Sequence, residues 1–129
     1  MDQGIQTFNM KIVPHRGDWR QVNIPRQADL FCQPPITTYQ GIHNGHLPKT
    51  DSFLKIDAPG IRITVLKQAE TNNDLIIRCI ESFGKRCVAH IDFPSIPANW
   101  RGEFTPFEIK SLRINPRNGQ ISMVNLLEE

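Results

Sequence analysis

Two histidines with metal-like spacing, His43 and His46, lie in a stretch rich in Pro, Gly, Asn and Thr. An HxxH pair can supply two imidazole ligands to one ion, but a structural zinc site normally has four protein ligands. No two further ligands stand near this pair in the sequence. The pattern therefore favours two solvated loop histidines, and we assign no metal ligand in this chain.

A pair of carboxyl groups about 5 Å apart would indicate a retaining glycosidase, which uses one as acid and one as nucleophile. Most of the 13 Asp and Glu residues fall in predicted turns or at strand edges. Glu108 is the exception, and alternation predicts that it points outward, towards Lys110 or Arg113. The chain also has no GxSxG elbow, phosphate-binding glycine loop or zinc-protease motif. We therefore assign no catalytic residue.

Two other histidines and two tryptophans have structural interpretations. His15 precedes a predicted turn, where its ring is expected to bond to the backbone, and His90 is expected to face outward from a strand. Trp19 and Trp100 could stack on sugar rings, but buried tryptophan contributes a large apolar area. Packing in the core or at a domain interface is the favoured interpretation for both.

The first half of the chain has little regular pattern. Residues 8–13 alternate apolar and polar side chains, which predicts a half-buried strand. Asp18 is expected to cap a short helix, and Pro25 to start a second one. Residues 34–52 form a long surface loop, and loops of this length are often functional. Three residues of this loop are the candidates to reach a cleft of a larger protein: His43, Asn44 and His46.

The second half is strongly β. Residues 61–65 alternate, and the apolar run 75–80 predicts a central strand covered on both faces. Residues 94–102 are expected to interrupt the pattern, whereas Asn118-Gly119 predicts a hairpin turn. The remaining strands are expected at 87–91, 107–114 and 120–124. About seven short strands indicate a mainly β protein, an antiparallel β-sandwich with one or two short helices near the N-terminus.

Composition excludes several classes of protein. The 129 residues suffice for a single domain, 1–129, and the formal charge of +2 comes from charges that alternate in sign, which argues against a nucleic-acid partner. No apolar run approaches the roughly 20 residues that span a bilayer, so no membrane partner is expected. Three cysteines without a CxxC pair favour free thiols in a reducing compartment, while a Cys79–Cys87 disulfide across a hairpin stays open as an alternative.

Three segments, in order, carry a family resemblance: residues 14–20 (PHRGDWR), 61–70 (IRITVLKQAE) and 104–114 (FTPFEIKSLRI). They resemble the C-terminal β-rich region of the α-mannosidases of glycoside hydrolase family 38. Residues 47–57 and 124–129 are similar to further segments of that region. The Pro-Phe-Glu-Ile-Lys motif is only moderately specific by itself, and the order and spacing of the segments make the match strong.

The resemblance implies a non-catalytic domain of an enzyme that hydrolyses terminal α-D-mannose residues. Family members bind a divalent metal, usually zinc, in an N-terminal barrel that also supplies the nucleophile, and none of those residues maps onto this chain. The domain alone is expected to be inactive and to need no cofactor. Its implied partners are the remainder of the α-mannosidase chain and, through it, a mannose-containing oligosaccharide, in the cytoplasm. Two alternatives stay open: a free-standing carbohydrate-binding module and an autonomous hydrolase.

Overall fold

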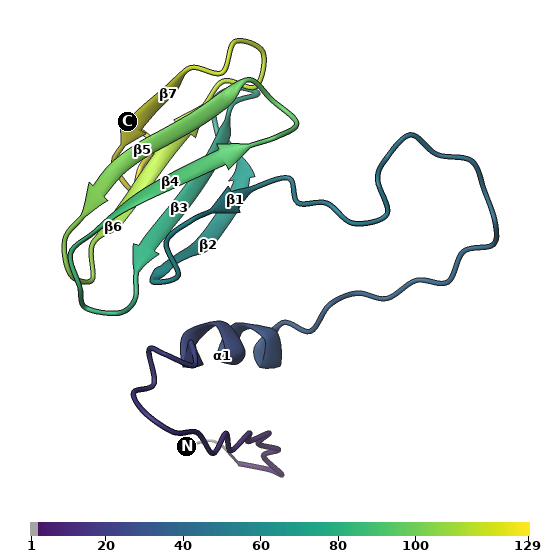
Figure 1. Ribbon diagram of the computed structural model, residues 1–129, viewed down its shortest axis with the longest axis vertical. Helices are drawn as coiled ribbons and strands as arrows, with labels where there is room; N and C mark the ends of the chain where they lie inside the picture. The colour runs from purple at the N-terminus through teal and green to yellow at the C-terminus, as the bar shows by residue number, and fades with distance from the viewer. Residues whose placement is uncertain (1–2) are drawn as a thin grey trace. The chain divides into compact units, whose positions relative to one another are not determined.

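The computed structural model describes residues 3–129 (Figure 1). These residues form one helix, α1 (Ile24–Cys32), and seven strands. The strands are β1 (Lys55–Ile56), β2 (Ile61–Gln68), β3 (Leu75–Glu81), β4 (Cys87–Phe93), β5 (Ala98–Phe104), β6 (Ile109–Ile114) and β7 (Ile121–Val124). The predicted class, a mainly β antiparallel sandwich with a short helix near the N-terminus, is confirmed.

The chain divides into two units, one up to Thr37 and one from Thr38 to Glu129, and all seven strands lie in the second. In the first, α1 begins after Asn23, whose Oδ1 accepts the Arg26 N–H at 3.2 Å. Pro25 stands in the first turn, as predicted, because a helix does not need its N–H there. The described residues include no helix with the length and apolar character of a membrane span.

Two predictions for the first unit are wrong. The helix expected after Asp18 is only a turn, in which the Gln21 N–H donates to the Asp18 carbonyl at 3.0 Å. The first turn of a helix is unfavourable to form, and a segment this short adds too few hydrogen bonds to offset that cost. The strand expected at residues 8–13 is absent. This segment has the alternation of a strand, but residues 3–37 contain no second strand to pair with it, and Phe8, for example, is 84% exposed.

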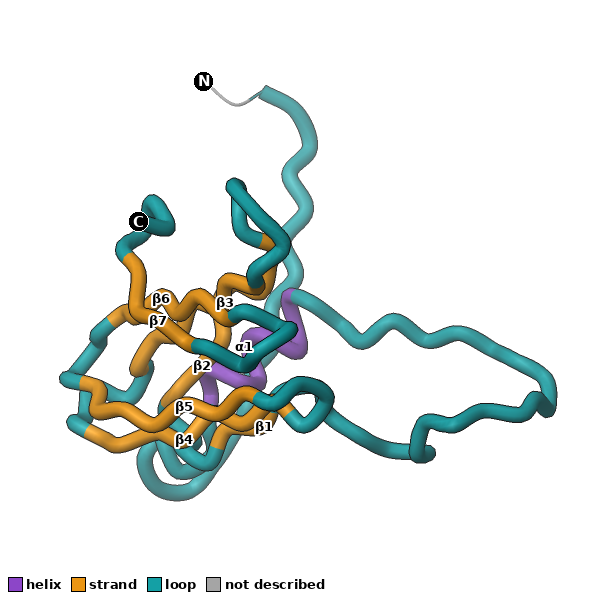
Figure 2. The backbone as a smooth tube through the Cα atoms, turned by 90° about the horizontal axis from the view of Figure 1, so that it is seen from above, coloured by secondary structure: helices purple, strands orange, loops and turns teal. Residues whose placement is uncertain are grey.

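The second unit consists of two antiparallel sheets packed face to face (Figure 2). The strand order is β1-β4-β5 in one sheet and β2-β3-β6-β7 in the other. Alternate residues of both sheets point between the layers and make the core. The core comprises Ile61, Ile77, Cys79, Ala89, Ile91, Phe93, Ala98, Phe104, Leu112 and Ile114.

The central strand β3 behaves as its sequence predicts. It pairs with β2 on one side and β6 on the other. Ile76 and Ile77 point to opposite faces and both are fully buried. The predicted hairpin between β6 and β7 is also confirmed. In its turn Gly119 has φ +71°, and the Gly119 N–H donates to the Asn115 carbonyl at 2.9 Å.

The expected interruption at residues 94–102 is wrong, because strand β5 begins at Ala98. The alternation of apolar and polar residues in β5 is hard to recognise in the sequence, because two of its inward positions hold the small residues Ala98 and Gly102. Gly102 is required here: a Cβ at this position would lie 2.3 Å from the Trp100 ring. Strand β6, in turn, begins at Ile109 and not at Phe107, which lies in a turn.

The strands at the sheet edges are short, irregular or charged. β1 has two residues and β7 has four. The pairing of β2 with β3 shifts register between Ile63 and Val65, a β-bulge. β5 carries exposed Arg101 and Glu103 on its outer side.

All three cysteines are free thiols. Cys79 lies on β3 and Cys87 on β4, in different sheets, and both thiols are free, so the alternative disulfide is not formed. Cys79 is fully buried, and burial raises its pKa to about 12, whereas Cys32 is exposed.

Thiol accessibility tests this packing. With a chromogenic disulfide reagent at neutral pH, we expect Cys32 to react rapidly in the native protein and Cys79 to react only after unfolding in urea, because the thiolate is the reactive form. Mass spectrometry of the labelled peptides assigns each site. Equal native rates for Cys32 and Cys79 would contradict the buried position.

Candidate functional site

The loop residues proposed to reach a cleft, His43, Asn44 and His46, are all exposed. The Nδ1 atom of His43 lies 3.1 Å from the carbonyl oxygen of its neighbour Asn44. Residues 3–129 contain no group of three or more His, Cys, Asp or Glu side chains that could hold a metal ion. The structure thus places the loop in solvent, and its role beside a cleft stays a prediction.

The predicted positions of His90, Glu108 and Trp100 are confirmed. His90 is exposed on β4, and Glu108 pairs with Lys110 at 2.9 Å. Trp100 packs against the core, with its ring centroid 5.8 Å from that of Phe104. Trp19 is half-buried in the first unit, where the Arg20 guanidinium lies 4.4 Å from its ring centroid. His15 is exposed.

A buried carboxylate, Glu81, is the feature that the sequence analysis missed. It ends β3, is 1% exposed, and points between the sheets. One oxygen, Oε1, accepts the Phe83 N–H at 2.8 Å. The other, Oε2, accepts N–H bonds from Gly84 at 2.7 Å, Lys85 at 3.1 Å and Phe107 at 3.1 Å. Glu81 therefore joins the β3–β4 turn to the β5–β6 turn.

These bonds set the charge state of Glu81. Burial acts to raise the pKa of its carboxyl group, but the four backbone N–H groups together outweigh burial and hold the pKa below its ordinary value. The group is thus ionised at neutral pH. Because both oxygens are occupied by backbone donors, Glu81 is an organiser of two turns and not a free acid or base.

The β5–β6 turn holds its aromatic residue in an unusual backbone conformation. The Glu108 N–H donates to the Thr105 carbonyl at 3.1 Å, which closes a β-turn with Pro106 and Phe107 at the two central positions. Phe107 has φ +61°. Its ring lies over Gly84, where an added Cβ would come within 2.6 Å of it, and the residue is still 64% exposed. The two turns therefore present an aromatic ring at one end of the sandwich.

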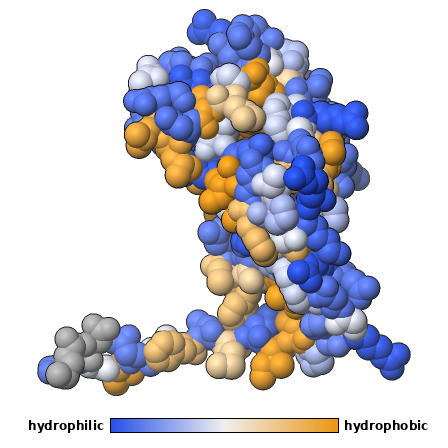
Figure 3. Space-filling model, turned by 90° about the vertical axis from the view of Figure 1, so that its left-hand side faces the viewer, coloured by the Kyte–Doolittle hydropathy of each residue, from blue (hydrophilic) through white to orange (hydrophobic). Residues whose placement is uncertain are grey.

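The outer face of the four-stranded sheet is covered only in part. Residues 125–129 cross it, since the Leu126 carbonyl accepts from Arg78 on β3 and the Glu128 carboxylate pairs with Lys67 on β2 at 2.7 Å. Nearer the two turns, Ile80 is half-buried and its cross-strand partner Ile109 is 51% exposed. We call Ile80, Phe107 and Ile109 the end patch. Apolar groups on the visible surface are shown in orange in Figure 3.

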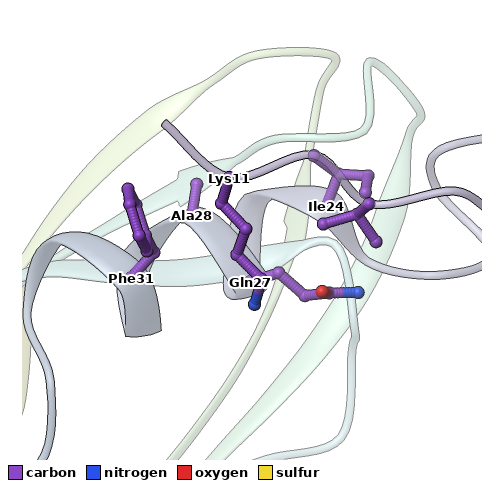
Figure 4. A pocket seen from close by; sticks show the side chains of 6 residues that line it. Lys11, Ile24, Gln27, Ala28 and Phe31 are labelled. Carbon is purple, nitrogen blue, oxygen red and sulfur yellow. The ribbon is translucent and has the colours of Figure 1, made fainter. Parts of the chain in front are cut away.

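A small cavity lies within the first unit, between residues 11–13 and α1 (Figure 4). Its volume is about 130 Å³. Apolar side chains line most of it, with one ammonium and one amide group: Val13, Ile24, Ala28, Phe31, Lys11 and Gln27. This lining includes no carboxylate, hydroxyl, thiol or imidazole group.

The second half of the chain matches the model of a known protein family. Residues 60–129 match the model described as the glycosyl hydrolases family 38 C-terminal beta sandwich domain. The chain belongs to glycoside hydrolase family 38. The match covers β2 to β7, and with them Glu81 and the end patch of the family 38 sandwich. No curated protein and no solved structure matched the chain.

The zinc of a family 38 active site does not fit the described part of this chain, which offers no cluster of three ligands. Its two buried carboxylates, Glu81 and Glu128, are bonded to backbone N–H groups or to Lys67. In this family 38 sandwich both carboxylates thus make contacts within the fold.

Proposed function

We propose that this chain is the non-catalytic C-terminal domain of an α-mannosidase, which packs against the catalytic region and helps to shape its cleft. The observation that carries the proposal is the match of residues 60–129 to the family 38 C-terminal sandwich. The structural roles of the two buried carboxylates support a domain without chemistry of its own. The end patch supplies an apolar surface that such a domain would bury.

The remaining parts of the proposal concern the whole enzyme. The zinc ion, the nucleophile and the contacts to a mannose-containing oligosaccharide would come from the catalytic region. The three free thiols support a reducing compartment such as the cytoplasm. A carbohydrate-binding module that used Trp19 or Trp100 would need that ring to be exposed, whereas Trp100 packs against the core and Trp19 is half-buried.

An activity assay tests this function. The chain is mixed, in the presence of zinc, with a family 38 α-mannosidase polypeptide from which the C-terminal sandwich has been removed, and hydrolysis of an aryl α-mannoside is followed. We expect turnover from the mixture and none from this chain alone.

The same assay separates the alternatives. Turnover by this chain alone would place a catalytic site within its residues and contradict the proposal. Binding of a mannose oligosaccharide by this chain, measured by calorimetry, with no effect on the truncated enzyme would favour the carbohydrate-binding module.

A further inference from the structure

The residue at the second central position of the β5–β6 turn conflicts with its backbone. The turn has Pro106 at its first central position and a positive φ at its second, the pattern of a type II turn, which favours glycine or asparagine there. This chain has Phe107 at that position. A bulky residue with positive φ is uncommon, and such conformations persist where the surroundings enforce them.

Two contacts hold Phe107 in this backbone conformation. The carboxylate of Glu81 accepts the Phe107 N–H at 3.1 Å, and Gly84 leaves room for the ring. The fold gains little in return, because Phe107 remains 64% exposed and is not part of the core cluster. The ring is thus held in place at a conformational cost without being used by the sandwich itself.

The surroundings of the ring also indicate the chemistry of what covers it. Ile80 and Ile109 extend the apolar surface. Lys85, in the same turn as Gly84, is also exposed. A complementary surface for the ring is an apolar pocket.

We infer that Phe107 is the anchor through which this sandwich docks on the preceding region of a family 38 enzyme, its ring filling an apolar pocket. The inference rests on the proposed function, because the family description makes this sandwich the C-terminal domain of a larger chain. Aromatic side chains that are rigid and central commonly dominate the affinity of an interface.

The variant Phe107→Asn tests the anchor. Asparagine tolerates the positive φ and removes the ring, so the melting temperature of the variant is expected to equal or exceed that of the wild-type chain. Its affinity for the α-mannosidase polypeptide that lacks the C-terminal sandwich is expected to fall at least tenfold in surface plasmon resonance. Phe107→Trp keeps an aromatic ring and is expected to retain binding within about threefold.

A matched control is Val88→Asn, which removes an exposed apolar side chain from β4, on the other sheet. Its affinity is expected to stay that of the wild-type chain. Equal binding by wild-type and Phe107→Asn chains would overturn the anchor alone and leave the proposed function standing. A clear drop in melting temperature for Phe107→Asn would also overturn it, because the ring would then serve the fold. Failure of the wild-type chain to bind would overturn both.

Discussion

Replacing Glu81 with glutamine is expected to lower the free energy of unfolding by about 3 kcal/mol. The carboxylate accepts four backbone N–H groups, and the amide NH2 of glutamine would face some of those donors with a donor of its own. Buried donors left without acceptors carry their full desolvation cost. Urea unfolding followed by tryptophan fluorescence measures the change.

The matched control is Glu103→Gln. Glu103 lies on the surface of β5, where it pairs with Arg86 at 2.6 Å and its side chain is 53% exposed. Exposed ion pairs contribute little, so a loss below about 1 kcal/mol is expected. Similar losses for Glu81→Gln and Glu103→Gln would contradict the organising role of Glu81.

The contribution of Glu81 should also depend on pH. The pKa of Glu81 is lowered in the folded chain, so its stabilising effect is fully present above the pKa of the unfolded chain, near 4.5. It is lost as the pH falls through the lower folded pKa. The difference in unfolding free energy between the wild-type chain and Glu81→Gln is therefore expected to be constant near neutral pH and to shrink below pH 4.5.

The second large effect is expected for Gly119→Ala, a loss of about 3 kcal/mol. Gly119 has φ +71°, where a side chain is strained. In addition, its Cβ would lie 1.8 Å from the carbonyl oxygen of Pro97, which belongs to the backbone of another turn and cannot rotate away. The two turns must separate to admit a methyl group. Thermal and urea unfolding measure the loss.

Gly41→Ala is the control for this change. Gly41 lies in the exposed loop, and no heavy atom lies within 4 Å of an added Cβ. A change within about 0.5 kcal/mol is expected. If Gly119→Ala unfolded at the same temperature and urea concentration as the wild-type chain, the contact between the two turns would be looser than the structure shows.

Much of the sandwich could be predicted from sequence, because its strands follow simple patterns. The alternation at Ile61, Ile63 and Val65 and the two-sided apolar run of β3 both marked real strands. The prediction failed where alternation was carried by small residues, as at Ala98 and Gly102 in β5. It also failed at residues 8–13, since pairing requires a second strand and a local pattern cannot supply one.

The candidate site was harder to predict for a related reason. The partners of Glu81 come from positions 83, 84, 85 and 107, and the last of these is distant in sequence. Glu81 stood just beyond the predicted end of β3, at residue 80, so it was not recognised as a buried acid. A local signal did exist for Phe107, because Thr105-Pro-Phe-Glu108 places proline where a type II turn prefers it.

The edge strands have a consequence for how the separated sandwich should behave at high concentration. Unprotected strand edges are templates for chain-to-chain pairing and amyloid growth. Here β1 and β7 are too short, β2 is bent by its bulge, and β5 carries charges. Contacts between copies would then arise from side chains such as Phe107 and Ile109. The resulting clusters would be small, would dissolve on dilution and would not seed fibrils.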